Sequence, residues 1–428
     1  MSAKQFYHKD VPPNLPYLPP EIWTTIIQHA TYVSGGYDPD VTTLALGLSA
    51  GTMNKEPLDI WKKSMVTRRS LVLVSKAWYI LASPFLYEYI LLGRGKAVLP
   101  LLLGMQRSKE AVGGDTVCPI GWWTKRLDVN LRDSTDKPRA DIDALGNIMT
   151  HLPNLRVLTF SITGHRYQRT LSPKVLWSVS CRDTLKFVHF YTTCLPSAEA
   201  WTVFLQNHPN LESLNLNEIS KAGRHPLTMQ FDSLKVVHIH ALYPIEFVPK
   251  EYLRNVWDYD LPSVRTATYE LEFSNNDDLP IERIFTKHGP KLTTLQLTQI
   301  YQITDMELEA AMQVTFSSIF AHCDALEQIN LIVHSWSMLT LDVPRFPPKV
   351  ATLVIRVIKG QISKKATVHL FDIFIYIKRR NPGLKTIRFA SGINVRGLQT
   401  HSVALEEGLW IMRDAGVVIE DHYGCALN

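Results

Sequence analysis

The hexamer LRVLTF at residues 155–160 decides the fold of this chain, because nine other segments repeat its pattern. Each segment has a first residue that is apolar in all but TKRLDV, two variable residues, and then an apolar–variable–apolar triplet. This alternation is typical of a β-strand that buries one face. The ten segments are TKRLDV (124–129), LRVLTF (155–160), LKFVHF (185–190), LESLNL (211–216), LKVVHI (234–239), VRTATY (264–269), LTTLQL (292–297), LEQINL (326–331), VATLVI (350–355) and LKTIRF (384–389).

The fourth residue of each segment marks the spacing of the repeats, and successive marks are 23 to 34 residues apart. One strand in roughly every 20 to 30 residues is the signature of leucine-rich repeats. Irregular steps and the lack of an asparagine ladder indicate a degenerate array. We call the marks the landmark residues: Leu127, Leu158, Val188, Leu214, Val237, Ala267, Leu295, Ile329, Leu353 and Ile387.

Helical patterns lie between the strand segments, as in ADIDALGNIMTHL (140–152), SAEAWTVFLQNHP (197–209) and TDMELEAAMQVTFSSIFAHC (304–323). Strand–helix units with all helices on one side build a right-handed parallel solenoid, or horseshoe. The predicted fold class is therefore α/β. A doubly wound α/β sheet is the alternative, although it does not explain one strand pattern repeated ten times. A helix at about 403–416 and the strand GVVIED (416–421) are expected to close the C-terminal end.

The front of the chain has a different pattern. Residues 1–15 are proline-rich and predict an irregular lead-in, and LPPEIWTTIIQHAT (18–31) predicts a helix with prolines in its first turn. Residues 33–57 are rich in Gly, Thr, Asp and Ser and predict a flexible insertion. A second helical region is expected from about Leu58 to Ser83, ended by Pro84. These helices have more apolar surface than they can bury against each other, so they either dock a partner or cap the repeats.

The front segments LPPEIWTTIIQHAT and SLVLVSKAWYILASPFLYEYILL resemble the F-box family, which has a Leu-Pro-x-Glu-Ile start, a Val-Ser/Cys-Lys-x-Trp helix and a Pro-x-Leu-Tyr exit. The resemblance covers residues 16–92, with Leu18 and Trp78 separated by about twice the usual distance. It implies docking to the Skp-type adaptor of a cullin–RING ubiquitin ligase. The matching, adaptor-binding positions are Leu18, Pro19, Glu21, Ile22, Ile26, Ile27, Val74, Ser75, Lys76, Trp78, Leu81, Pro84 and Leu86.

These observations predict four parts: the lead-in at 1–15, an F-box-like helical domain at 16–92 with its insertion at 33–57, a linker at 93–122, and a degenerate leucine-rich-repeat domain at 123–428 with its C-terminal cap. The variable strand position after each landmark is expected to face the concave side, where such arrays bind partners. For any single one of them, plain solvated strand surface is an equal alternative. The candidates are Thr159, His189, Asn215, His238, Thr268, Gln296, Asn330 and Arg388.

Composition and motifs bear on the class of protein. The net charge of +5 over 428 residues requires no nucleic-acid partner, and no apolar run is long enough for a membrane span. Five cysteines without a CxxC pair predict reduced thiols, and therefore a cytoplasmic or nuclear protein. No catalytic motif is found, so no enzyme activity, cofactor or metal is expected. His238 and His240 share a strand face and could hold a metal, but no further ligand accompanies them.

The leading hypothesis is a substrate receptor of a Skp–cullin–F-box-type ubiquitin ligase, in which the front helices bind the adaptor and the repeats bind a target protein. Trp78, Leu18 and Ile26 are its expected adaptor anchors. The second hypothesis is a ligase-independent scaffold in which the front helices only cap the array. An enzyme with an unrecognised site is the third.

Overall fold

The structure is a computed structural model and describes most of the chain in separate ranges. These are residues 18–33, 55–111, 118–131, 138–162, 173–192, 198–215, 219–220, 233–240, 253–254, 260–271, 281–299, 316–333, 335–336, 339, 345–358 and 361–428. The predicted lead-in at 1–15 lies outside the described residues, as do positions 34–54 of the predicted insertion.

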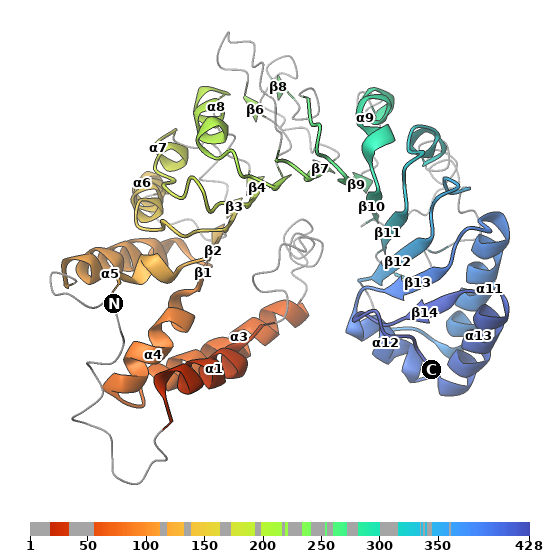
Figure 1. Ribbon diagram of the computed structural model, residues 1–428, viewed down its shortest axis with the longest axis horizontal. Coiled ribbons are helices and arrows are strands. Elements are labelled where there is room, and N and C mark those ends of the chain that lie inside the picture. Colours follow the sequence, from red (N-terminus) through yellow and green to blue (C-terminus); the bar gives the residue numbers. More distant parts are fainter. Residues whose placement is uncertain are drawn as a thin grey trace.

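Twelve described strands form one parallel sheet in which strand order follows chain order. Figure 1 shows the strands along the inner side of an open arc. A doubly wound sheet reverses its strand order at one point, so that alternative does not describe this sheet. The strands are β1 (Tyr89–Leu92), β2 (Arg126–Leu131), β3 (Val157–Ile162), β4 (Phe187–Thr192), β5 (Ser213–Asn215), β7 (Val236–His240), β9 (Thr266–Leu271), β10 (Thr294–Gln299), β11 (Gln328–Val333), β12 (Thr352–Val357), β13 (Thr386–Phe389) and β14 (Val418–Glu420). A short antiparallel pair, β6 (Ile219–Ser220) and β8 (Leu253–Arg254), is separate from it.

The ten landmark residues stand in one continuous register row across the sheet, so the predicted strand register is confirmed. The row continues to Ile90 on β1 and to Ile419 on β14, two strands that the hexamer pattern did not include. Nine of the ten landmark side chains are described, and each is 0% exposed. One row of apolar side chains is therefore the centre of the hydrophobic core.

Helices cover the outer side of the arc and alternate with the strands, which makes the chain a mixed α/β protein (Figure 1). The predicted helices at 140–152, 197–209 and 403–416 are confirmed, and of 304–323 only 316–323 is described, with helix at 316–321. The helices are α5 (Val98–Ala111), α6 (Pro138–Met149), α7 (Pro173–Trp177), α8 (Ala198–Asn207), α9 (Ile281–His288), α11 (Lys364–Arg380), α12 (Gly392–Gln399) and α13 (Ser402–Asp414). In the described part of the chain no helix is both long and apolar enough to span a bilayer.

The predicted linker at 93–122 is wrong over residues 98–111. These residues form α5, whose Val98, Leu102 and Met105 are buried in the same core as the landmark residues. Their spacing of four and three residues places them on one helix face. Pro100 lies in the first turn of α5, where its missing N–H removes no helical hydrogen bond. The sheet and its helical cover therefore begin at β1, directly after the front helices.

Polar side chains link several of the turns that precede strands to the turn before the preceding strand in the sheet. Asn154 and Asn210 donate side-chain N–H groups to backbone carbonyls one repeat earlier, at 2.7 and 3.3 Å. The hydroxyl of Thr184 donates to the backbone carbonyl of Leu155 at 2.9 Å, and that of Ser233 donates to the carbonyl of Leu211 at 2.8 Å. Backbone carbonyls in irregular turns need such partners when they are shielded from water. Mixed Asn, Thr and Ser side chains thus join successive turns although the sequence has no regular asparagine ladder.

The C-terminal tail covers the last edge of the sheet, as predicted for the segment around GVVIED. Glu420 on β14 forms an antiparallel bridge with Ala426, and the backbone N–H of Leu427 donates to the carbonyl of Ile419 at 2.9 Å. Free strand edges promote pairing with other chains. The tail therefore occupies backbone groups that an exposed β14 would offer to another strand.

We predict that Leu295→Ala destabilises the protein by about 2–5 kcal/mol, because it leaves a cavity in the landmark row at the middle of the sheet. Val403→Ala is the control, because this α13 side chain is 70% exposed, and its loss should cost less than about 0.5 kcal/mol. Urea unfolding followed by tryptophan fluorescence measures both. Equal midpoints for the two variants would contradict the central role of the row.

Thiol reactivity tests the same core. Cys181 and Cys323 are free and buried, and burial raises the pKa of both thiols to about 12, whereas Cys118 and Cys425 are free and exposed. The thiolate is the reactive form. In a Cys194→Ser variant at mildly alkaline pH, we therefore expect an aromatic disulfide reagent to modify two thiols quickly, and two more only after denaturant is added. Four equally fast thiols would show that the core is not packed as described.

Candidate docking surface

Three helices precede the sheet in the described part of the chain: α1 (Pro20–Thr31), α3 (Lys55–Val72) and α4 (Lys76–Tyr87). The single helical region predicted from Leu58 to Ser83 is wrong, because it breaks at Ser75. The Ser75 hydroxyl accepts a hydrogen bond from the Trp78 backbone N–H at 3.2 Å and so caps the start of α4. Pro84 does not end α4, since it lies close to the C-terminal end and costs only the hydrogen bond to Ile80. Residues 55–57 of the predicted insertion belong to α3.

A buried arginine holds these three helices together. Arg68 on α3 is 1% exposed, and its guanidinium donates to the carbonyl of Thr31 at 2.9 Å and to the carbonyl of Phe85 at 2.6 Å. Its Nε also donates to the Ser64 hydroxyl at 3.0 Å. The two carbonyls belong to the last turns of α1 and α4, where helices have unsatisfied acceptors and partial negative charge. One cation therefore satisfies the C-terminal ends of both neighbouring helices.

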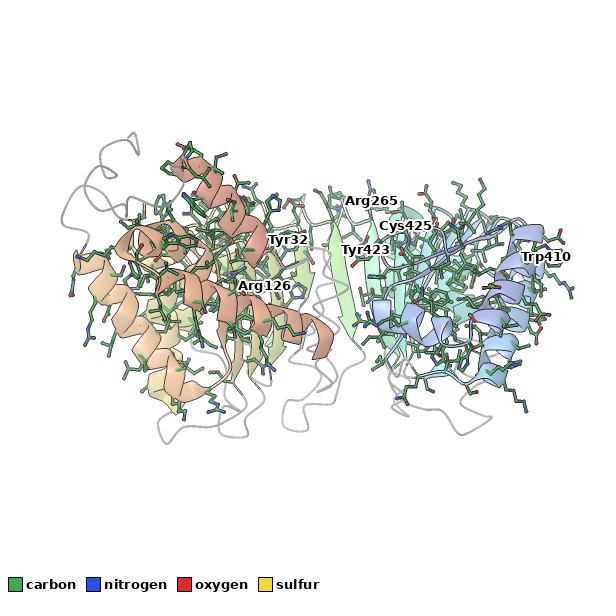
Figure 2. The ribbon with its side chains drawn as sticks, turned by 90° about the horizontal axis from the view of Figure 1, so that it is seen from below. Tyr32, Arg126, Arg265, Trp410, Tyr423 and Cys425 are labelled. Atoms are coloured by element: carbon green, nitrogen blue, oxygen red, sulfur yellow. The ribbon has the colours of Figure 1, made fainter. Side chains whose placement is uncertain are left out.

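The front helices also pack against the inner face of the first strands. The ring of Trp61 on α3 lies 5.2 Å from the ring of Tyr89 on β1. The Tyr89 hydroxyl is hydrogen-bonded to Asp128, whose carboxylate accepts from the Arg126 guanidinium at 2.9 Å. The same guanidinium lies 4.8 Å from the centre of the Tyr89 ring. Figure 2 labels Arg126 and Tyr32 in this region, with Trp410 toward the opposite end of the molecule.

The structure divides the F-box-like positions into three groups. Ile27 is 1% exposed and lies inside the helical module, so its predicted role in binding the adaptor is wrong. The buried stripe of α1 runs through Trp23, Ile27 and Thr31, which leaves the adjacent stripe of Ile22 and Ile26 in solvent. Pro19, Glu21, Ile22, Ile26, Val74, Ser75 and Lys76 are exposed, whereas Leu18, Trp78, Leu81, Pro84 and Leu86 are half-buried.

Exposed apolar side chains gather on α1 and around the start of α4. We define the front apolar surface as Ile22, Ile26, Leu73, Val74, Tyr79 and Ile80, which are 43–84% exposed. The rings of Trp23 and Trp78 lie 5.1 Å apart and join α1 to α4. Leu73, Tyr79 and Ile80 are not among the predicted positions, although all three lie in the segment SLVLVSKAWYILAS (70–83) that resembles the F-box. Soluble proteins expose such groups of large apolar residues chiefly where they bind partners.

The candidate target-binding residues occupy the register row next to the landmarks, but this row is not open to solvent. Thr159, His189, Thr268, Gln296 and Asn330 are all at most 8% exposed. Adjacent strands lie about 4.8 Å apart, so neighbouring side chains in the row cover one another. The expectation that these five residues form an exposed recognition face is therefore wrong.

The remaining three candidates are Arg388, Asn215 and His238. Arg388 is half-buried and pairs with Glu420, Nη2 to Oε2 at 2.7 Å. The side chains of Asn215 and His238 lie outside the described part of the structure. The side chains of His238 and His240, considered above as a metal site, also lie outside the described part of the structure. Elsewhere in the described ranges, no three His, Cys, Asp or Glu side chains come together as a metal-binding group.

A pocket of about 760 Å³ opens beside the C-terminal end of α11. Its titratable side chains are Arg345 and Arg380, and the rest of its lining is mainly apolar, with Phe320, Phe346 and several prolines. The described residues of its lining include no carboxylate or histidine that could serve as a general base. The front apolar surface therefore remains the more informative site.

Comparison with models of known protein families gives no match to this chain, and comparison with curated proteins gives none either.

We predict that Arg68→Met destabilises the front helices by about 3 kcal/mol, because it leaves the carbonyls of Thr31 and Phe85 buried without their cation. Arg69→Met is the matched control, since the neighbouring Arg69 is exposed. Hydrogen exchange should rise in α1 and α4 in the first variant and stay unchanged in the second. Similar exchange in both variants would contradict the role of Arg68.

Proposed function

We propose that this chain is the substrate receptor of a Skp–cullin–F-box-type ubiquitin ligase. The front helices dock the Skp-type adaptor, and the sheet with its helices is a degenerate leucine-rich-repeat solenoid that presents a target protein. The observation that carries this proposal is the front apolar surface, which lies on the helices that resemble the F-box.

Residues of the F-box-like segments have structural roles that fit the proposal. Pro20 opens α1 at its first position, Ser75 caps α4, and Trp78 packs against Trp23. These residues set the positions of α1 and α4 and leave Ile22 and Ile26 in solvent. Burying two such side chains in an interface is favourable by roughly 1.5–3 kcal/mol each. The apolar side chains needed for docking are thus available without any rearrangement of the module.

The contact between α3 and the sheet supports a role in positioning. Ubiquitin transfer would be performed by other subunits, and a receptor accelerates it by holding the target close to them. Such proximity requires a fixed connection between the adaptor-binding helices and the repeats. Trp61 on Tyr89, together with the bond from Tyr89 to Asp128, provides this connection.

A ligase-independent scaffold is the second candidate, and the same contact favours it. If the only task of the front helices were to close the array, Trp61 packed on Tyr89 of the first strand would be sufficient. The exposed stripe of Ile22 and Ile26 has no role in that function. The two candidates therefore differ in what they require of this stripe.

We predict that Ile22→Asp combined with Ile26→Asp weakens binding of a purified Skp-type adaptor at least about 30-fold, because a charge replaces apolar contact at each site. Val403→Asp combined with Trp410→Asp introduces the same charge at exposed apolar sites on α13 and should change binding less than about two-fold. Calorimetry with the full chain measures both.

Adaptor binding at full strength by the Ile22 and Ile26 variant would contradict the proposed docking surface. If the unchanged chain does not bind the adaptor at all, the scaffold function is favoured. In that case removal of residues 1–87 should lower the melting temperature of the repeats, because the first strands lose their cover.

A further inference from the structure

A row of basic residues lies at the end of the sheet where the strands begin. Lys125, Arg156, Lys186, Lys235 and Arg265 each directly precede a strand, and we call them the amino-edge strip. Glu212 occupies the equivalent position before β5, between Lys186 and Lys235. Figure 2 labels Arg265 at this end of the strands. Of the six strands β2, β3, β4, β5, β7 and β9, five are therefore directly preceded by a cation.

The backbone holds the strip in register. The N–H of Arg156 donates to the carbonyl of Lys125 at 2.7 Å, and that of Lys186 donates to Arg156 at 2.9 Å. The backbone N–H of Glu212 donates to the carbonyl of Lys186 at 2.8 Å, and that of Lys235 donates to Glu212 at 2.8 Å. The N–H of Arg265 donates in turn to the carbonyl of Lys235 at 2.9 Å. Since neighbouring strands are about 4.8 Å apart, the five steps span on the order of 24 Å.

The side chains of the strip are accessible and partly fixed. Arg156, Lys186, Lys235 and Arg265 are exposed, and the side chain of Lys125 is 42% exposed. Nη1 of Arg265 donates to the carbonyl of Val264 at 2.8 Å, and Nζ of Lys125 lies 2.7 Å from Oε1 of Glu88. Groups that are already held in place lose less entropy when they bind a ligand.

Glu212 makes the strip uneven in charge. Its carboxylate accepts from Lys186 at 2.5 Å and from Lys235 at 3.1 Å. The hydrogen bond from Lys186, reinforced by Lys235, lowers the pKa of Glu212, so it stays ionised at neutral pH. The strip thus has a negative group near its middle, with the exposed Arg156 on one side of it and the exposed Arg265 on the other. The chain as a whole has only five more Lys and Arg than Asp and Glu, so this local excess is a concentration of charge.

We propose that the amino-edge strip binds an extended acidic segment of a partner protein. At about 3.3 Å per residue, a segment of roughly eight residues matches the length of the strip. A peptide can place an uncharged residue opposite Glu212 and acidic residues opposite the cations. A nucleic-acid strand has a phosphate at every nucleotide and cannot avoid Glu212 in this way. Charge complementarity of this kind gives specificity and fast, salt-dependent association.

Fluorescence anisotropy with the full chain tests this proposal independently of the adaptor. The probe is a labelled peptide of about eight residues that alternates Glu and Ser, and the comparison peptide alternates Gln and Ser. We expect only the Glu peptide to bind at low ionic strength, and its affinity to fall as salt is added. Arg156→Glu combined with Arg265→Glu should weaken binding at least about ten-fold.

Lys364→Glu combined with Lys365→Glu is the matched control, because both lysines are exposed at the start of α11, outside the strip. It makes the same change in net charge and should alter binding less than about two-fold. Arg156→Gln combined with Arg265→Gln keeps the test valid if the Glu variant fails to fold.

Three results would overturn the proposal. The first is no binding of the Glu peptide at millimolar concentration. The second is equal loss in the strip variant and the control, which would mean that only net charge matters. The third is tighter binding of an oligothymidine strand, lost in the same strip variant, which would make the strip a nucleic-acid site.

Discussion

The structure depends on one constraint: the strands of the parallel sheet bury their apolar side chains together in one register row. The row from Ile90 to Ile419 meets this constraint, since every step in it is a register pair of adjacent parallel strands. A shift of one residue in any strand would turn its landmark toward the inner face. The twelve-stranded sheet therefore tolerates unequal repeat lengths but not an altered alternation within the strands. Loops and helices absorb the variation between 23 and 34 residues.

The same constraint makes the two ends of the sheet special. At β14 the tail supplies backbone partners through Ala426 and Leu427, so the last strand has no long free edge. At β1 the chain continues directly from α4, and Trp61 and Tyr89 fix the front helices to the inner face. The front module is thus part of the closure of the array. It also keeps an apolar surface in solvent, which closure alone does not require.

Cations serve two opposite purposes in this chain. Arg68 is fully buried, and hydrogen bonds to the ends of α1 and α4 offset the cost of removing its charge from water. The amino-edge cations remain in water, where single ion pairs contribute little to stability. Their regular spacing comes from the register of the sheet, so a structural repeat creates a regular charged surface. The register row next to the landmark residues is the converse case, because its polar side chains are regularly spaced but buried.

The sequence by itself determined eleven of the twelve strands of the sheet and the helices α1, α6, α8 and α13, because these depend on local alternation and helical periodicity. Only the tertiary structure decided which apolar residues are accessible: Ile26 is exposed and Ile27 is buried, although they are adjacent in one helix. It also decided that residues 98–111 cover the sheet and that the polar row of Thr268 and Gln296 is closed to solvent. Periodicity identifies a face of an element, whereas burial depends on what packs against that face, and that partner comes from distant parts of the chain.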